Sequence, residues 1–172
     1  MSQSIVFTFI GLDKPGLVEK LSNTVSTAGG NWLESRMSQL AGHFTGIARV
    51  QISSDKSEAL ISALQALSGD ELTVSIQPDH HADKGTDYKI QKLHLLGNDR
   101  PGIVKELSSA LAAFNINVCD METQVTSAPM TAEPLFEANA EIEVPSHINM
   151  AELSDKLEDI ANTLTVDINL ED

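Results

Sequence analysis

The stretch GLDKPGLV at residues 11–18 returns as GNDRPGIV at residues 97–104, so both copies follow the pattern G-x-D-[KR]-P-G-[LI]-V. The two copies then stay in register without a gap, through Leu21 and Leu107 and as far as Asn31 and Asn117. A match that keeps its register over this length is typical of a repeated structural unit. We therefore expect two copies of one module in the chain.

The second half of the module repeats as well, after a longer loop in the second copy. The matching residues are Phe44, Ala48, Val50 and Ile52 in the first copy, and Phe136, Ala140, Ile142 and Val144 in the second. The longer loop spans residues 127–134, whose prolines and small residues are typical of a turn. Between the copies, residues 78–87 are polar and unpatterned. We expect a first domain at residues 1–78, a linker at 79–87 and a second domain at 88–172.

Hydrophobic periodicity predicts the same elements in each copy. Ile5, Phe7 and Phe9 alternate with other residues, as in a half-buried strand, and an apolar stripe that includes Val18 and Val104 predicts the first helix. A strand is expected from Asn31, after the glycines that end this helix. A third strand, a second helix and a last strand follow, the helix with Leu60, Ala63, Leu64 and Leu67 in the first copy and Leu153, Leu157, Ile160 and Leu164 in the second.

The order strand, helix, strand, strand, helix, strand predicts an α+β fold. It can form a ferredoxin-like βαββαβ domain, in which a four-stranded antiparallel sheet carries both helices on one face. The other face of each sheet is left open. Two such domains in one chain can complete each other, and we expect them to pack as an intramolecular pseudo-dimer.

The charge of the chain disfavours contact with nucleic acids and with anionic membranes. The formal net charge is −14, and the arginines are only Arg36, Arg49 and Arg100. Such a chain lacks the basic stripe that DNA and RNA require. No apolar run is long enough to cross a membrane, and the single cysteine, Cys119, suits a reducing compartment as a small buried residue. We expect a cytoplasmic protein without a cofactor that has another protein as its partner and that could form a homo-oligomer.

The repeated loop is the candidate ligand site. A helix N-terminus presents unpaired N–H groups to a carboxylate, and Gly16 and Gly102 allow a ligand to approach the backbone closely. Asp13, Asp99, Asn31 and Asn117 could hold an ammonium group nearby, so the residues suit an amino acid. An equally good interpretation is structural: the aspartates cap helices, and the asparagines bond the backbone where their strands begin.

Catalysis and metal binding have weak support. The sequence contains no motif of a hydrolase, a metalloprotease or a nucleotide-binding enzyme, and His43, His94 and Cys119 do not align between copies. His80 and His81 lie among acidic residues, but adjacent histidines in a polar linker are usually solvated. We expect no catalytic residue and no metal site.

The repeated loop, the amphipathic helix and the Asn-led strand resemble the ACT-domain family, twice, over nearly the whole chain. This resemblance implies amino-acid binding between modules, through the first loop and the start of the second strand. The implied positions are Leu12, Asp13, Pro15, Gly16 and Asn31 in the first copy, and Asn98, Asp99, Pro101, Gly102 and Asn117 in the second.

A tandem pair of such domains without a fused enzyme is similar to the bacterial repressors of the glycine cleavage operon. That similarity implies a repressor which contacts a DNA-binding transcriptional activator and which glycine relieves. The alternative is a constitutive protein-binding regulatory module with no ligand response.

Overall fold

The structure is a computed structural model that describes residues 1–79, 87–128 and 132–171. The chain divides into two compact units, Met1–Ala82 and Asp83–Asp172, here called the first and the second unit. Most of the expected linker, residues 80–86, lies outside the described residues. Each unit has its own hydrophobic core, and the expected packing of the two as a pseudo-dimer stays a prediction.

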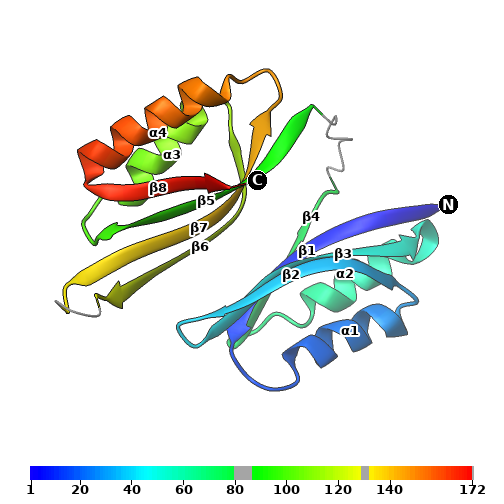
Figure 1. Ribbon diagram of the computed structural model, residues 1–172. Helices are drawn as coiled ribbons and strands as arrows, with labels where there is room; N and C mark the ends of the chain where they lie inside the picture. The colour runs from blue at the N-terminus through cyan, green and yellow to red at the C-terminus, as the bar shows by residue number, and fades with distance from the viewer. Residues whose placement is uncertain (80–86, 129–131, 172) are drawn as a thin grey trace. The chain divides into compact units, whose positions relative to one another are not determined.

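The first unit has the predicted βαββαβ order. Its elements are β1 (Ser2–Leu12), α1 (Leu17–Thr27), β2 (Asn31–Leu40), β3 (His43–Ser53), the 3-10 turn η1 (Ser54–Lys56), α2 (Ser57–Gln65) and β4 (Leu72–Gln77). The strands form an antiparallel sheet in the order β2-β3-β1-β4, with α1 and α2 on one face (Figure 1). Alternation places Phe7 and Phe9 under the helices, where they meet Leu21 and Leu60 in the core.

The second unit repeats this plan. Its elements are β5 (Tyr88–Asn98), α3 (Ile103–Ala113), β6 (Asn117–Ser127), β7 (Pro134–Pro145), α4 (Met150–Leu164) and β8 (Val166–Glu171). The sheet order is β6-β7-β5-β8, and α3 and α4 cover one face (Figure 1). The α+β fold with two ferredoxin-like domains is therefore confirmed, and each core joins the apolar faces that periodicity predicted.

The longer loop of the second copy lies between β6 and β7. In the first unit, Ala41 and Gly42 alone join β2 to β3, with φ values of 50° and 78° that suit a tight hairpin. In the second unit, Ser127 and Pro134 at the ends of the expected loop pair with each other as strand residues. Residues 129–131 of that loop lie outside the described residues.

Two expectations about burial are wrong. Val18 and Val104 are 41% and 43% exposed, because the preceding residues, Leu17 and Ile103, take the inward position in the first turn of each helix. Cys119 is exposed rather than buried, because it is the extra residue of a β-bulge in the edge strand β6. Within the described ranges, no helix is both long and apolar enough to span a membrane.

Candidate functional site

The loop between β1 and α1 is held from two sides in the first unit. The Leu12 N–H donates to the Glu71 carbonyl at 3.1 Å, and the Asp13 N–H donates to the Gly42 carbonyl at 2.9 Å. Gly11 permits the first approach, because a Cβ there would lie 2.8 Å from the Glu71 oxygen. In the second unit the Asp99 N–H donates to the Pro134 carbonyl, also at 2.9 Å. The first glycine of the motif thus serves backbone packing.

The basic position of the motif ties each loop to the segment before the last strand. Lys14 Nζ lies 2.5 Å from Glu71 Oε1, and this hydrogen bond, with the lysine charge, lowers the pKa of Glu71 from its usual value. In the second unit, Arg100 Nε donates to the Leu164 carbonyl at 3.2 Å. No role was predicted for these two residues, although the basic residue shared by both motifs was the signal that could have revealed one.

The second glycine of each motif is the N-cap of the following helix. Gly16 and Gly102 have φ values of 91° and 98°, a left-handed conformation that glycine adopts without steric cost. Neither helix receives a side-chain capping hydrogen bond within the described residues, so the interpretation of Asp13 and Asp99 as N-caps is wrong. The N–H groups of the first helical turn remain available to an anion.

The surroundings of these two glycines differ. Among the residues that the structure describes, and apart from its chain neighbours, none lies within 4 Å of a Cβ built on Gly16, whereas Glu106 Oε1 lies 3.8 Å from one built on Gly102. The position of Glu106 in the repeat is held by Lys20 in the first unit. Lys20 is close enough to Glu71 to lower its pKa, after the larger effects of Lys14. Glu19 is acidic in the first turn of α1 as Glu106 is in that of α3, and Lys105 takes the place of Glu19, so the two helices carry the same two charges in exchanged order. The first loop is thus distinguished by the open space at Gly16.

A surface hollow borders each loop. The one in the first unit has a volume of about 810 Å³ and runs from Gly16 and Lys20 along α1 to Ala63 of α2. The one in the second unit has about 440 Å³ and lies beside Asn98 and Thr165. Leu12, Pro15 and Pro101 are exposed, as are both loops as a whole.

The asparagines of the candidate site lie far from the loop of their own unit. Asn31 pairs with Gln51 of β3, and Gln51 in turn pairs with Ser4 of β1. Leu12, next to the loop, is at the other end of β1. The separation along the strand is about 27 Å, at about 3.4 Å per residue. Asn117 is placed equivalently, and its side chain donates to Glu143 Oε2 at 2.9 Å. One unit therefore brings the loop residues together and leaves its asparagine at the opposite end of the sheet.

The three candidates for catalysis occupy separate places. His43 lies at the β2–β3 turn of the first unit, with Nδ1 3.3 Å from the Ala41 carbonyl. In the second unit His94 contacts Glu137 at 3.0 Å, and Cys119 lies beside Asn117. Among the residues that the structure describes, no group of His, Cys, Asp and Glu could hold a metal ion, and His80 and His81 lie outside them.

Family comparisons match both halves of the chain. A family model of the ACT domain matches residues 3–77, and a second ACT-domain model matches residues 84–167. No protein of curated function matches the sequence.

Two solved structures resemble the chain over almost its full length. One is an unknown protein from Galdieria sulphuraria, which is 27% identical with a TM-score of 0.88, over 99% of this chain and 98% of that one. The other is provisionally described as a glycine cleavage system transcriptional repressor. It is 20% identical with a TM-score of 0.74, over 99% of this chain and 97% of that one.

Proposed function

This chain belongs to the ACT-domain family, with one domain in each half, and we propose on that basis that it is an amino-acid-responsive regulatory protein without catalytic activity. The observation that carries the proposal is the pair of exposed loops, each of which places a left-handed glycine before a helix whose first turn receives no side-chain cap within the described residues. The carboxylate of an amino acid is the anion that this arrangement suits.

The first unit is the stronger candidate for binding. At Gly16 the backbone is open, whereas the carboxylate of Glu106 stands close to Gly102. We infer that the amino acid places its carboxylate on the N–H groups that follow Gly16.

The ammonium group of the ligand needs a partner of its own. Asp13 is the nearest acidic candidate in the sequence of the loop, and Asn31 or Asn117 can take part only from another unit or another copy. The residues of the candidate site therefore do not form one site within a single unit.

The likeness to the structure described as a glycine cleavage repressor supports a finer proposal. We infer that this chain represses transcription by contact with a DNA-binding activator of the glycine cleavage operon, and that glycine relieves the contact. The net charge of −14 supports an action through protein rather than through DNA.

Thermal unfolding of the purified protein against each amino acid at millimolar concentration tests the ligand response. A ligand that binds only the folded state stabilises it by about 2.7 kcal/mol at a hundredfold excess over its dissociation constant. We expect glycine to raise the unfolding midpoint selectively. If no amino acid raises it, the constitutive protein-binding module becomes the better account.

Matched charge reversals locate the site. Lys20→Glu should weaken glycine binding, because it places a carboxylate near the first loop, by roughly fivefold for an effect of about 1 kcal/mol. Glu106→Lys should leave the affinity of the first unit unchanged. Asp13→Ala should weaken binding without unfolding the protein, and Asp99→Ala tests the second loop in the same way. If Lys20→Glu and Asp13→Ala both bind as the wild type does, the first loop is not the site.

The partner is tested by mobility shift with operon DNA. The protein alone should not retard the DNA, whereas it should retard the activator–DNA complex further, and glycine should reverse that second shift. Retardation of DNA by the protein alone would contradict the proposal.

A further inference from the structure

The sheet face opposite the helices, here called the open face, differs in charge between the two units. In the first unit the buried residues of β3 alternate with Ile47 and Arg49, and the neighbouring residues on β2 are Arg36 and Glu34. Ile10 and Ile47 on this face are 49% and 45% exposed. The face thus combines exposed apolar side chains with two arginines.

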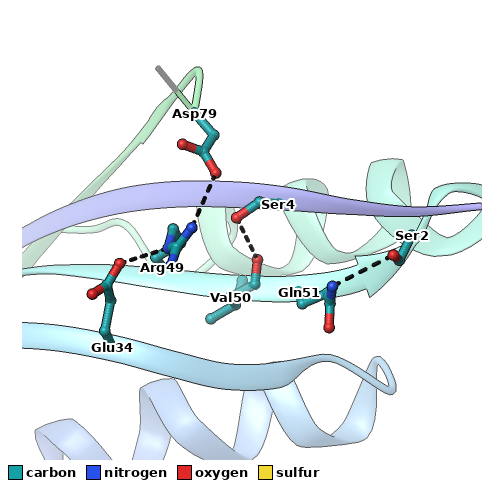
Figure 2. Close-up of polar contacts among 7 residues, drawn as sticks. All are labelled: Ser2, Ser4, Glu34, Arg49, Val50, Gln51 and Asp79. Atoms are coloured by element: carbon teal, nitrogen blue, oxygen red, sulfur yellow. Dashed lines mark hydrogen bonds and ion pairs between the residues drawn. The ribbon is translucent and has the colours of Figure 1, made fainter. Parts of the chain in front are cut away.

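Arg49 is held in place at the centre of a hollow on this face. Its Nε lies 2.6 Å from Glu34 Oε1, and its Nη1 lies 3.9 Å from Asp79 Oδ2 (Figure 2). The hollow has a volume of about 830 Å³ and is lined by both arginines, by Val6 and by Ile47. A side chain that is only 25% exposed and fixed by carboxylates needs little reordering to meet a partner.

The open face of the second unit is acidic, whereas that of the first unit sets Arg36 and Arg49 beside Glu34. Its acidic residues alternate along the strands with inward-facing residues, and they are Asp120, Glu122, Glu137, Glu141, Glu143, Asp167 and Glu171. The basic residue among them is Lys92. The repeat places Glu122 where the first unit has Arg36, and Glu141 where it has Arg49. The same two sheet positions have therefore opposite charges in the two units.

We propose that the open face of the first unit binds the open face of the second unit in a second copy of this chain. Two copies related by a twofold axis make this contact twice, which closes the assembly as a dimer. Copies with a net charge of −14 repel each other in most orientations, and this pairing is the one that sets arginines against carboxylates. Contact also removes Ile10 and Ile47 from water.

Sedimentation velocity over a wide range of concentrations tests the proposal with two charge reversals on exposed side chains. Arg36→Glu makes the first open face acidic, and Glu122→Arg adds a positive charge to the second. Either variant alone should dimerise at least about tenfold more weakly, because both contacts then oppose like charges. An equimolar mixture of the two variants should dimerise as the wild type does, since both contacts of the mixed dimer are matched.

Lys105→Glu is the matched control, because it makes the same change of charge on α3, away from the open face, and should leave dimerisation unchanged. Circular dichroism confirms that each variant is folded. A wild-type protein that is monomeric throughout would overturn the proposal, as would a mixture that dimerises no better than its components. The proposal would also be overturned if the protein is a monomer, each single variant is less stable than the wild type, and the Arg36→Glu, Glu122→Arg double variant regains that stability. In that case the occupant of the open face would come from the same chain.

Discussion

The first loops of the two units are fastened to different acceptors. In the first unit Lys14 pairs with the carboxylate of Glu71, which lies in a connection of several residues between α2 and β4. In the second unit α4 is longer and β8 follows almost directly, so Arg100 reaches the backbone carbonyl of Leu164. The contact is thus kept while its chemistry changes. The difference indicates that the basic residue serves to hold the loop, whatever acceptor the neighbouring segment offers.

The cores differ in a similar way. At the centre of β1 the first unit has Phe7, with the rings of Phe9 and Trp32 at 6.4 Å and 5.6 Å, whereas the corresponding residue of β5 is Leu93. Both Phe7 and Leu93 are buried. The burial pattern is therefore repeated although the side chains that satisfy it are not.

Truncation of a core side chain should have the largest effect on the stability of each unit. Phe7→Ala should cost about 3–5 kcal/mol and Leu93→Ala about 2–5 kcal/mol in unfolding free energy. Trp32 is the only tryptophan, so its fluorescence follows the first unit in chemical denaturation. Phe7→Ala should shift that transition strongly and Leu93→Ala much less. Equal shifts would mean that the two units unfold together.

Replacement of the first motif glycine should come next. In Gly97→Ala the new Cβ would overlap Val166 Cγ1 and lie 2.8 Å from the Val166 Cα, so the backbone must move. In Gly11→Ala the corresponding contact is 2.8 Å, to the Glu71 oxygen. Both should cost about 1–3 kcal/mol in chemical denaturation, Gly97→Ala the more. Gly69→Ala is the control, because no described residue other than its chain neighbours lies within 4 Å of the new Cβ. A Gly97→Ala protein as stable as this control would contradict the prediction.

The second helices provide a smaller contrast. Asn149 caps α4 by accepting a hydrogen bond from the Ala151 N–H at 3.0 Å, whereas Lys56 precedes α2 without a side-chain cap. Asn149→Ala should therefore lower the unfolding free energy by about 1 kcal/mol. Lys56→Ala should change it by much less. Thermal unfolding of both variants measures the difference, and similar losses would argue against the cap.

Acid should change the contributions of the two loop contacts to stability differently. This effect should be smaller than those of the core, glycine and cap variants. The pKa of Glu71 is lowered in the folded protein, so its contact with Lys14 stabilises above the usual value of 4.5 and is lost as the pH falls through the lowered pKa. Glu71→Gln should thus lower the unfolding midpoint at neutral pH and have no effect in acid. Arg100→Met should lower it at both, because a carbonyl does not titrate in this range. A constant effect of Glu71→Gln would contradict the assignment.

Most of the fold could be predicted, because the signals that specify it are local. The repeated motif, the alternation in Ile5, Phe7 and Phe9 and the glycines after α1 all agree with the observed elements. The exposure of Cys119 could not be predicted, since it depends on a bulge that only the pairing of β6 with β7 reveals.

The candidate site was predictable only in part. The motif identified Gly16 and Gly102 as unusual positions, and both are left-handed N-caps. The predicted order already placed Asn31 after the helix that follows Gly16, but the position of Asn31 at the far end of the sheet from Leu12 depends on the pairing of β2, β3 and β1. The charges that distinguish the units, such as Lys20 and Glu106, are single substitutions within an otherwise repeated pattern.

The bulges of β2 and β6, at Leu33 and Cys119, lie in strands at the edge of each sheet. A straight edge offers an unbroken row of N–H and C=O groups, to which a strand of another molecule can be added indefinitely. An extra residue twists the edge and interrupts that row. The opposite edges, β4 and β8, are the shortest strands. Both features of the edges disfavour the growth of fibrils from the protein's own sheets.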